Sequence, residues 1–325
     1  MAPRRDLGSI GHEPVMLHEV VAMLAPKSGG RYLDGTFGGG GHAAALIAGS
    51  EPDGVILAID ADPAAAVRAA ALREKLDRPD RLRLIHGNFG DMAQIARDAG
   101  VVPLDGVLLD LGLSSFQLDD PNRGFSFRFD GPIDMRFDPT RGRSAGDLVN
   151  ELPARDLADV IWRYGEESRS RRIASAIERE RERAPIESAA HLAAVVERAV
   201  GGRRGSDTHP ATRTFQALRI AVNDELSVLE RALGDAVDLL APDGRLAVIA
   251  FHSLEDRIVK QFVQRESATC ICPPEQPVCT CGHVPRLRAL SRAVKPSTDE
   301  IARNPRSRSA ILRVAERLVG NGAKA

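Results

Sequence analysis

The segment 32–43 contains residue types that suit a nucleotide-binding turn. Its sequence, YLDGTFGGGGHA, has four consecutive glycines after an apolar stretch that ends at Asp34, and His42 follows the glycines directly. Glycine lets a ligand approach the backbone closely, and the first turn of a helix offers unpaired N–H groups. The segment therefore predicts a ligand site at a turn between a strand and a helix.

Three ligand classes compete for this turn. A nucleoside triphosphate loop is excluded, because it needs a Lys-Ser/Thr pair after the glycines and none follows here. A dinucleotide turn would fit Gly38, Gly40 and Ala43. Asp60 comes 20 residues after Gly40, where a ribose-binding carboxylate is expected in that class. Asp34 favours S-adenosylmethionine instead, because a carboxylate pairs with an ammonium and repels a pyrophosphate. The plainer interpretation of Asp34 is a turn or helix-capping residue.

A third carboxylate, Asp110, ends the apolar stretch GVLLD. Ligands of open α/β sheets bind at the carboxyl ends of the strands, so Asp110 is expected to face the reacting methyl group. Amino-group methyltransferases carry an acidic or amide residue here, followed by two prolines and an aromatic residue. This chain has Leu111, Gly112, Leu113 and Ser114 instead, so the match is partial. Asp110 is either the proton acceptor or a purely cofactor-binding group.

Alternating strand and helix signals position these groups. Apolar runs predict strands that end at Asp34 and Asp60, at 81–89 and 104–113, and near the C-terminus at 309–318. Helical patterns separate the first four, which predicts an α/β fold with a doubly wound parallel sheet. Residues 114–140 look loop-like, and 144–204 read as helices only. We therefore expect a main domain of residues 1–140 and 205–325, with an inserted helical subdomain at 141–204. The helix, or helix pair, at 212–240, the strand within 241–253 and the helix at 254–266 resume the main pattern.

Composition indicates a soluble globular protein. The chain has 325 residues, no apolar run near the length of a membrane span, and no apolar segment behind its N-terminal arginines. We therefore expect a cytoplasmic protein without a membrane partner. The net charge of −1 is unevenly distributed: residues 1–150 carry −5, and residues 268–325 carry +6. A basic C-terminal segment on an acidic body suits a polyanionic partner, although it also suits a solvated surface.

All four cysteines lie in one segment, CICPPEQPVCTC, at positions 270, 272, 279 and 281. Four thiolates so close together could hold one zinc ion, although the spacing is not the common C-x2-C pair. The alternative is a proline-rich surface loop with unliganded thiols, and disulfides are not expected in a cytoplasmic chain. No metal ligand is assigned from the sequence. A metal here would be structural rather than catalytic, since the loop is distant in sequence from the glycine-rich turn.

Several longer motifs together closely resemble the bacterial ribosomal RNA small subunit methyltransferase H family. They are DGTFGGGGH, LDLGLSSFQLDD, RGFSF, GPIDMR, HPATRTFQALRI, FHSLEDR and NPRSRSAILRVAER, and the resemblance spans roughly residues 10–318. It implies a class I S-adenosylmethionine-dependent methyltransferase with a Rossmann-like sheet. It also implies methylation of N4 of a cytidine in the decoding region of 16S rRNA, position 1402 in the usual rRNA numbering. The cofactor-binding positions it implies are Gly40, Gly41, His42, Asp60, Phe89, Asp110 and Gln117.

The expected partner is 16S rRNA within the 30S subunit, and not DNA. Residues 116–137 hold five of the ten phenylalanines with Arg123, Arg128 and Arg136 between them, a composition that suits stacking on unpaired bases. The alternative is that these phenylalanines form the apolar underside of a long loop. Residues 203–215 and the arginine-rich tail are expected phosphate contacts. The rival functions are an NAD-dependent dehydrogenase, a DNA or RNA amino-methyltransferase of other specificity, and a non-catalytic assembly factor.

Overall fold

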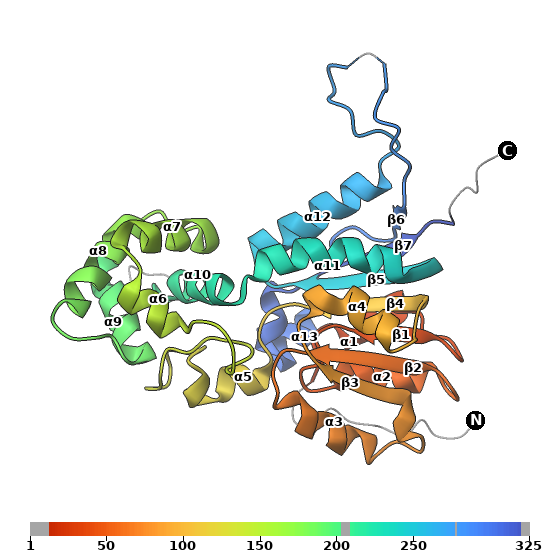
Figure 1. The fold of residues 1–325 in the computed structure, drawn as a ribbon, viewed down its shortest axis with the longest axis horizontal. Helices are drawn as coiled ribbons and strands as arrows, with labels where there is room; N and C mark the ends of the chain where they lie inside the picture. Colours follow the sequence, from red (N-terminus) through yellow and green to blue (C-terminus); the bar gives the residue numbers. More distant parts are fainter. Residues whose placement is uncertain (1–12, 203–208, 277, 320–325) are drawn as a thin grey trace. The chain divides into compact units, whose positions relative to one another are not determined.

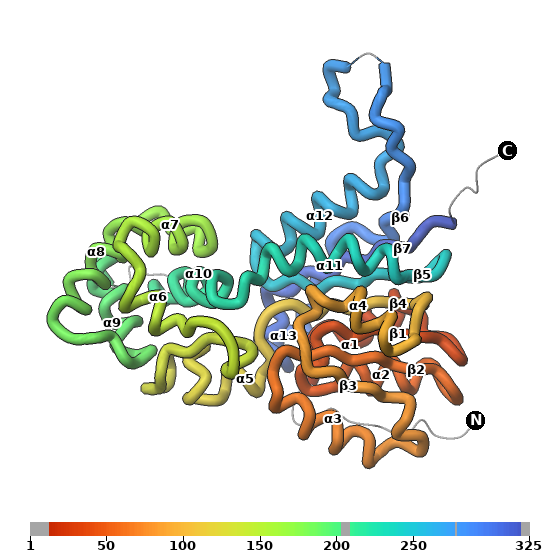
Figure 2. Tube along the Cα trace, in the orientation of Figure 1, coloured from red at the N-terminus to blue at the C-terminus, as the bar shows by residue number. Residues whose placement is uncertain are grey.

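A computed structural model describes residues 13–202, 209–276 and 278–319 of the chain (Figure 1). The chain divides into two compact units. The first takes the described residues of Met1–Gly112 and Leu226–Ala325, and the second is Leu113–Glu225. Figure 2 traces the chain from strand β4 into the second unit and back into helix α11. The predicted insert, 141–204, lies inside the second unit, whose bounds are wider on both sides.

The first unit is built on a sheet with the strand order β3-β2-β1-β4-β5-β7-β6. Strands β1 to β5 are parallel where they pair, and β7 runs antiparallel to both β5 and β6. The chain order reverses between β1 and β4, so the carboxyl ends of these two strands open a crevice at which ligands bind in such sheets. The strands are β1 Arg31–Asp34, β2 Val55–Asp60, β3 Leu82–His86, β4 Leu104–Asp110, β5 Leu240–Ala250, β6 Leu287–Ala289 and β7 Ile311–Arg317.

Two apolar layers cover the sheet, because alternate strand residues point to opposite faces. Leu33 and Leu57 join one core with α4 Met92–Asp98, α11 Glu225–Leu239 and α12 Ser253–Ser267. Tyr32 and Ile56 join the other with α1 Leu17–Leu24, α2 Gly41–Gly49 and α3 Ala65–Arg73. The sheet is thus buried on both faces, as its continuous apolar runs predict.

The second unit has its own helical core. Its helices are α5 Ser115–Asp119, α6 Ala145–Glu151, α7 Ala154–Gly165, α8 Ser170–Arg181, α9 Ala189–Val200 and α10 Thr212–Asn223. The segment 113–140 belongs to this unit because Phe125, Ile133 and Met135 are buried in the same core as the helices. Phe215 and Leu218 of α10 are buried there too. The wider bounds of the unit follow from these contacts.

The predicted strands and most predicted helices are confirmed. The pattern at 212–240 proves to be two helices, since Asp224 takes a left-handed conformation with φ of 51° between α10 and α11. Residues 114–140, expected to be loop, contain α5 and a short 3-10 turn at Pro121–Arg123. Helix α1, strand β6 and helix α13 Thr298–Arg303 were not predicted. Each of these has at most eight residues, too few for periodicity to show clearly.

Candidate active site

The glycine-rich turn joins β1 to α2 and follows a path that requires glycine. Gly38 and Gly40 have φ of 53° and 77°, in the left-handed region that glycine adopts without strain. The N–H of Gly40 donates to the carbonyl of Phe37 at 2.7 Å. A Cβ on Gly40 would lie 2.7 Å from the Phe37 ring. The turn therefore places bare backbone and the start of α2, at Gly41, beside the carboxyl ends of the strands.

Asp34 is buried at the end of β1 with one of its two carboxylate oxygens unsatisfied. Its side-chain Oδ1 accepts a hydrogen bond from the N–H of Thr36 at 3.1 Å. Its Oδ2 is enclosed and has no hydrogen-bond partner among the described residues. Desolvation raises the pKa of Asp34 to about 7, although the bond from Thr36 opposes the shift. An enclosed acceptor of this kind suits a ligand that brings a positively charged donor.

Asp110 ends the neighbouring strand β4 and repeats this arrangement. Its backbone N–H donates to Oγ1 of Thr36 at 2.7 Å, which ties the ends of β1 and β4 together. Its Oδ1 is likewise enclosed and unpaired among the described residues. Burial raises the pKa of Asp110 well above its ordinary value, and the charges of Asp34 and Glu255 add to the shift. Because the charge of Asp34 raises the pKa of Asp110, a cation beside both carboxylates would favour the ionised form of Asp110.

His42, in the first turn of α2, lies beside Asp110 but is not its ion-pair partner. Its Nε2 is 3.0 Å from the carbonyl oxygen of Val15. A carbonyl only accepts, so Nε2 carries the proton and Nδ1 is left as an acceptor. Burial lowers the pKa of His42 to about 4 against the opposing effect of the Val15 bond, so the ring is neutral at pH 7. The 3.6 Å between Nδ1 and Oδ2 of Asp110 is a polar contact rather than a hydrogen bond.

Asp60 is the last residue of β2, and Phe89 comes shortly after the end of β3. The N–H of Gly38 donates to Oδ2 of Asp60 at 2.7 Å, and the N–H of Asp62 donates to Oδ1 at 2.8 Å. Each oxygen keeps a second lone pair, so Asp60 can still accept ribose hydroxyl groups. Phe89 is partly buried, and a Cβ on Gly35 would lie 3.1 Å from Cβ of Phe89. Both residues therefore lie along the same sheet edge as Asp34.

Gln117 is the one predicted cofactor residue that belongs to the second unit. It is buried in α5, where its Oε1 accepts from the N–H of Ser114 at 3.0 Å. The N–H of Gln117 in turn donates to Oγ of Ser114 at 3.2 Å, which completes a capping box. The carboxamide oxygen thus stabilises the start of a short helix.

Two residues near Asp110 were not predicted from the sequence. Thr36 contacts both Asp34 and Asp110, as described above. Glu255, in the first turn of α12, is buried and accepts hydrogen bonds from the N–H groups of Phe251 and His252 at 2.8 and 3.2 Å. His252 and Glu255 form a capping box at the start of α12. The motif FHSLED does not reveal this pair until the first residue of the helix is known.

The structure favours the plainer interpretation for part of the phenylalanine-rich segment 116–137. Phe125 is buried and stacks on Phe137 with ring centroids 5.8 Å apart, inside the second unit. Phe127 packs at 5.1 Å against Phe215 of α10. Phe125 is therefore a core residue, and Phe127 and Phe137 are partly buried against the same core. Phe129, in contrast, is exposed. Of the expected phosphate contacts at 203–215, residues 203–208 lie outside the described part of the chain.

A surface pocket adjoins the carboxyl end of β5. Its lining includes Phe251, His252 and Ser309, together with the two cationic side chains Arg257 and Lys260. Within the described ranges, no helix is long and apolar enough to cross a bilayer.

The strand order, with one antiparallel strand next to the last position, is that of class I S-adenosylmethionine-dependent methyltransferases. The residues present fit this cofactor. Two enclosed carboxylate oxygens, on Asp34 and Asp110, can accept hydrogen bonds from a cationic group, and they lie beside a turn that exposes backbone. The same carboxylates would repel the pyrophosphate of a dinucleotide, so the rival dehydrogenase does not suit the site.

The chain belongs to the MraW methylase family, whose model matches residues 9–318, and S-adenosylmethionine is its cofactor. It is similar to a ribosomal RNA small subunit methyltransferase H of Thermomicrobium roseum, at 59% identity over 97% of this chain and 96% of the relative. A protein of the same name from Acidiphilium cryptum is 51% identical over 96% and 99% of the two chains. Among solved structures, an rRNA methylase from Streptococcus thermophilus aligns over 96% of this chain and 100% of its own, at 11% identity and a TM-score of 0.42. The assignment rests on the family match and the relatives.

Proposed function

We propose that this protein transfers a methyl group from S-adenosylmethionine to N4 of a cytidine in the decoding region of 16S rRNA, within the 30S subunit. The relatives named ribosomal RNA small subunit methyltransferase H support the rRNA substrate, since they match this chain over nearly its whole length. The base and its atom come from the motif resemblance. The observation that carries the proposal is the pair of unsatisfied carboxylates at the adjoining ends of β1 and β4.

In the proposed site, each cofactor-binding residue has a defined task. The enclosed oxygen of Asp34 accepts from the ammonium of the amino-acid part, and Asp60 accepts from the ribose hydroxyls. Gly40 and Gly41 bring backbone close to the amino-acid part, and Phe89 offers a ring face to the adenine. Gln117 is assigned to the cofactor by the motif resemblance alone. The bound cofactor supplies an electrophilic methyl group on its sulfonium.

Asp110 is the proposed proton acceptor. The exocyclic amine of cytosine is a poor nucleophile, because its lone pair is delocalised into the ring, so a group that accepts an N4 proton assists attack. Oδ1 of Asp110 is enclosed and has no protein donor among the described residues, so it is available for that proton. Its raised pKa favours the protonated form in the cofactor-free protein. A bound cation offsets the repulsion from Asp34 and Glu255 and favours the ionised, basic form.

His42 is the proposed positioning residue for this acceptor. Because Val15 fixes the tautomer, Nδ1 presents a lone pair to Oδ2 of Asp110 at 3.6 Å. A lone pair that faces Oδ2 disfavours negative charge on that oxygen, so ionised Asp110 carries more of its charge on Oδ1, the atom proposed to accept the N4 proton. Oδ1 then remains directed away from the histidine contact.

The RNA is expected to meet cationic and exposed aromatic groups. Arg257 and Lys260 line the pocket at the end of β5, and residues 268–325 carry a net charge of +6. Phe129 and the neighbouring Arg128 are suited to stack on an unpaired base, which the enzyme must take out of its stack to reach N4. The proposed site of action is the cytoplasm, where small subunits are assembled.

The test compares acceptors and two matched variants. Purified protein is incubated with labelled S-adenosylmethionine and, in parallel, 30S subunits lacking the modification, deproteinised 16S rRNA, or duplex DNA. We expect label in the 30S sample and none in DNA. Asp110→Asn should lower the rate by at least about 100-fold. Asp105→Asn, on the same strand but at its other end beside Lys27, should not. Preferential labelling of DNA, or equal rates for the two variants, would contradict the proposal.

A further inference from the structure

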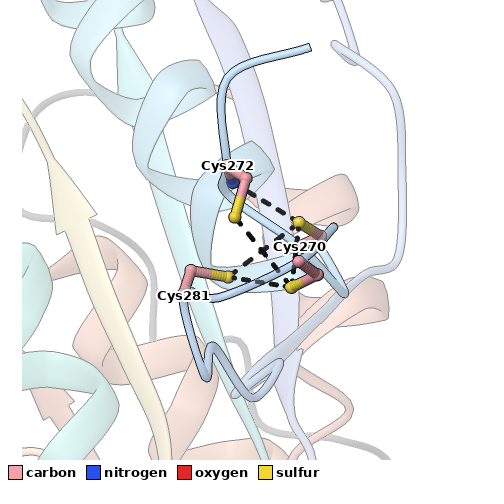
Figure 3. Close-up of side chains that lie close together, drawn as sticks. Cys270, Cys272 and Cys281 are labelled. Carbon is pink, nitrogen blue, oxygen red and sulfur yellow. Dashed lines mark hydrogen bonds between the residues drawn. The ribbon is translucent and has the colours of Figure 1, made fainter. Parts of the chain in front are cut away.

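The four cysteines converge on one point in the loop that leads from α12 to β6 (Figure 3). The Sγ atom of Cys270 lies 3.4 Å from that of Cys279 and 3.9 Å from that of Cys281. Cys279 Sγ is 3.6 Å from Cys281 Sγ and 4.0 Å from Cys272 Sγ. All four sulfur atoms lie within 4.8 Å of one another. Two C-x-C pairs thus meet face to face across the loop.

These separations match the edges of a tetrahedron around a single metal ion. Zinc–thiolate bonds of about 2.3 Å place tetrahedral sulfur ligands about 3.8 Å apart. A disulfide needs about 2.05 Å between sulfur atoms, and all four cysteines are free thiols in this structure. An iron–sulfur cluster has several metal ions among its cysteines and would hold their sulfur atoms further apart. The geometry therefore favours one ion with four thiolate ligands.

Backbone amides around the sulfur atoms add the donors that thiolates need. The N–H of Cys272 lies 3.4 Å from Sγ of Cys270 and donates to it. The N–H groups of Ile271 and His283 donate to Sγ of Cys281. Hydrogen bonds to an ionised acceptor are stronger than neutral ones, so these amides stabilise the charge that four thiolates bring to one ion.

The described residues of the loop are held together by hydrogen bonds rather than by an apolar core: Gln276 donates to the carbonyl of Val278 at 3.0 Å and to Oγ1 of Thr280 at 2.7 Å. Within 269–286, none of the described residues is buried, and Ile271, Val278 and Val284 are all exposed. The base of the loop is fastened by Arg286, which donates to Glu266 at 2.6 Å and to Asp238 at 2.9 Å. These two ion pairs lie at the base of the loop, and the described part of the loop contains no apolar core. A metal ion supplies the missing cross-link, as it does in other small segments that lack a core.

We propose that Cys270, Cys272, Cys279 and Cys281 bind one Zn²⁺ ion as a closed structural site that holds the loop between α12 and β6. All four coordination positions are filled by protein sulfur, so no position is open for water or substrate. The site is consequently structural rather than catalytic. It stands independently of the proposed methylation reaction.

The experiment measures metal on the full-length protein, purified without a metal-affinity step and under reducing conditions. Elemental analysis should find one zinc per chain in the native protein. Cys270→Ser/Cys279→Ser should contain almost none. Val278→Ser, an exposed position in the same loop, is the matched control and should keep its zinc. Thiol titration should detect four reactive cysteines only after a strong chelator has removed the metal.

Cobalt replacement keeps the test decisive if the cysteine variant fails to fold. Native protein that is stripped and reloaded with Co²⁺ should show the thiolate-to-metal charge-transfer band and the visible bands of a tetrahedral ion. S-adenosylmethionine binding by the variant reports whether the rest of the chain is folded. The proposal is overturned if native protein exposes four titratable thiols without chelator and takes up no metal. It is equally overturned by a disulfide among these residues, by an octahedral cobalt spectrum, or by zinc retained in the double variant.

Discussion

Lowering the pH should weaken cofactor binding through Asp34. Its pKa of about 7 in the empty site means that the carboxyl group is about half protonated at neutral pH, because burial disfavours the charge. A protonated Asp34 cannot pair with an ammonium group through its enclosed Oδ2. Cofactor binding must therefore displace a proton, and the apparent affinity falls as the proton becomes harder to remove.

The size of the effect follows from that pKa. With an empty-site pKa of 7, the apparent Kd is multiplied by about 2 at pH 7 and by about 100 at pH 5. The predicted loss between these two values is roughly 50-fold, or about 2.3 kcal/mol. Both pH 5 and pH 7 lie below the pKa of about 7.7–8.0 of an α-amino group, so the ammonium of the cofactor stays mostly charged over this range. The pKa of Asp110 is raised as well, so its ionisation can only make the affinity depend more steeply on pH.

Isothermal titration calorimetry from pH 5 to pH 7 measures this dependence directly. Repeating the titration in buffers of different ionisation enthalpy gives the number of protons released. Asp34→Asn should bind more weakly at pH 7 and lose most of the pH dependence, whereas Asp105→Asn should retain it. A wild-type Kd that is flat over this range, or a pH dependence as large in Asp34→Asn as in the wild type, would refute the assignment of Asp34.

Further predictions concern stability and turnover. Because the folded-state pKa of Asp34 is raised, its protonation stabilises the cofactor-free protein, and that contribution is lost as the pH rises towards and through about 7. From pH 5 to pH 8, the free energy of unfolding of the wild type should fall by about 3 kcal/mol more than that of Asp34→Asn. The Tm of the wild type should then fall by about 6–12 °C more than the Tm of the variant. Gly40→Ala should cost at least about 1 kcal/mol in denaturant titrations and weaken cofactor binding, since φ is 77° and the Phe37 ring occupies the Cβ position. Phe125→Ala should destabilise the protein by about 3–5 kcal/mol, because it opens the core of the second unit. Phe129→Ala should leave the unfolding midpoint unchanged and lower the rate of rRNA methylation, and a loss of stability there would contradict its exposed position.

The sheet and its carboxylates could be predicted from the sequence because they follow local rules. Apolar runs mark buried parallel strands, and Asp34, Asp60 and Asp110 each end one of them. The carboxyl ends of parallel strands meet at one edge, so three residues far apart in sequence could be placed together before any coordinates were known. The glycine turn was also predictable from a local rule, because Gly38 and Gly40 take conformations that other residues avoid.

Long-range contacts explain what could not be predicted. The carbonyl of Val15 fixes the tautomer of His42, and Glu255 acts on Asp110 from a helix at the far end of the sequence. Neither contact leaves a periodic signal. The phenylalanines of 116–137 have the composition of a stacking surface, yet Phe125 and Phe137 are packed against each other because the segment covers a helical core. Composition alone does not say which face of a loop is buried.

Methyl transfer to N4 of a cytidine in small-subunit rRNA is the proposed reaction, and it can be measured directly. The most direct measurement incubates the protein with methyl-labelled S-adenosylmethionine and 30S subunits that lack the modification, digests the rRNA to nucleosides, and identifies the labelled product by chromatography and mass. We expect the label in N4-methylcytidine, at about one per subunit and at a single position. Label in another nucleoside, or spread over many positions, would contradict it.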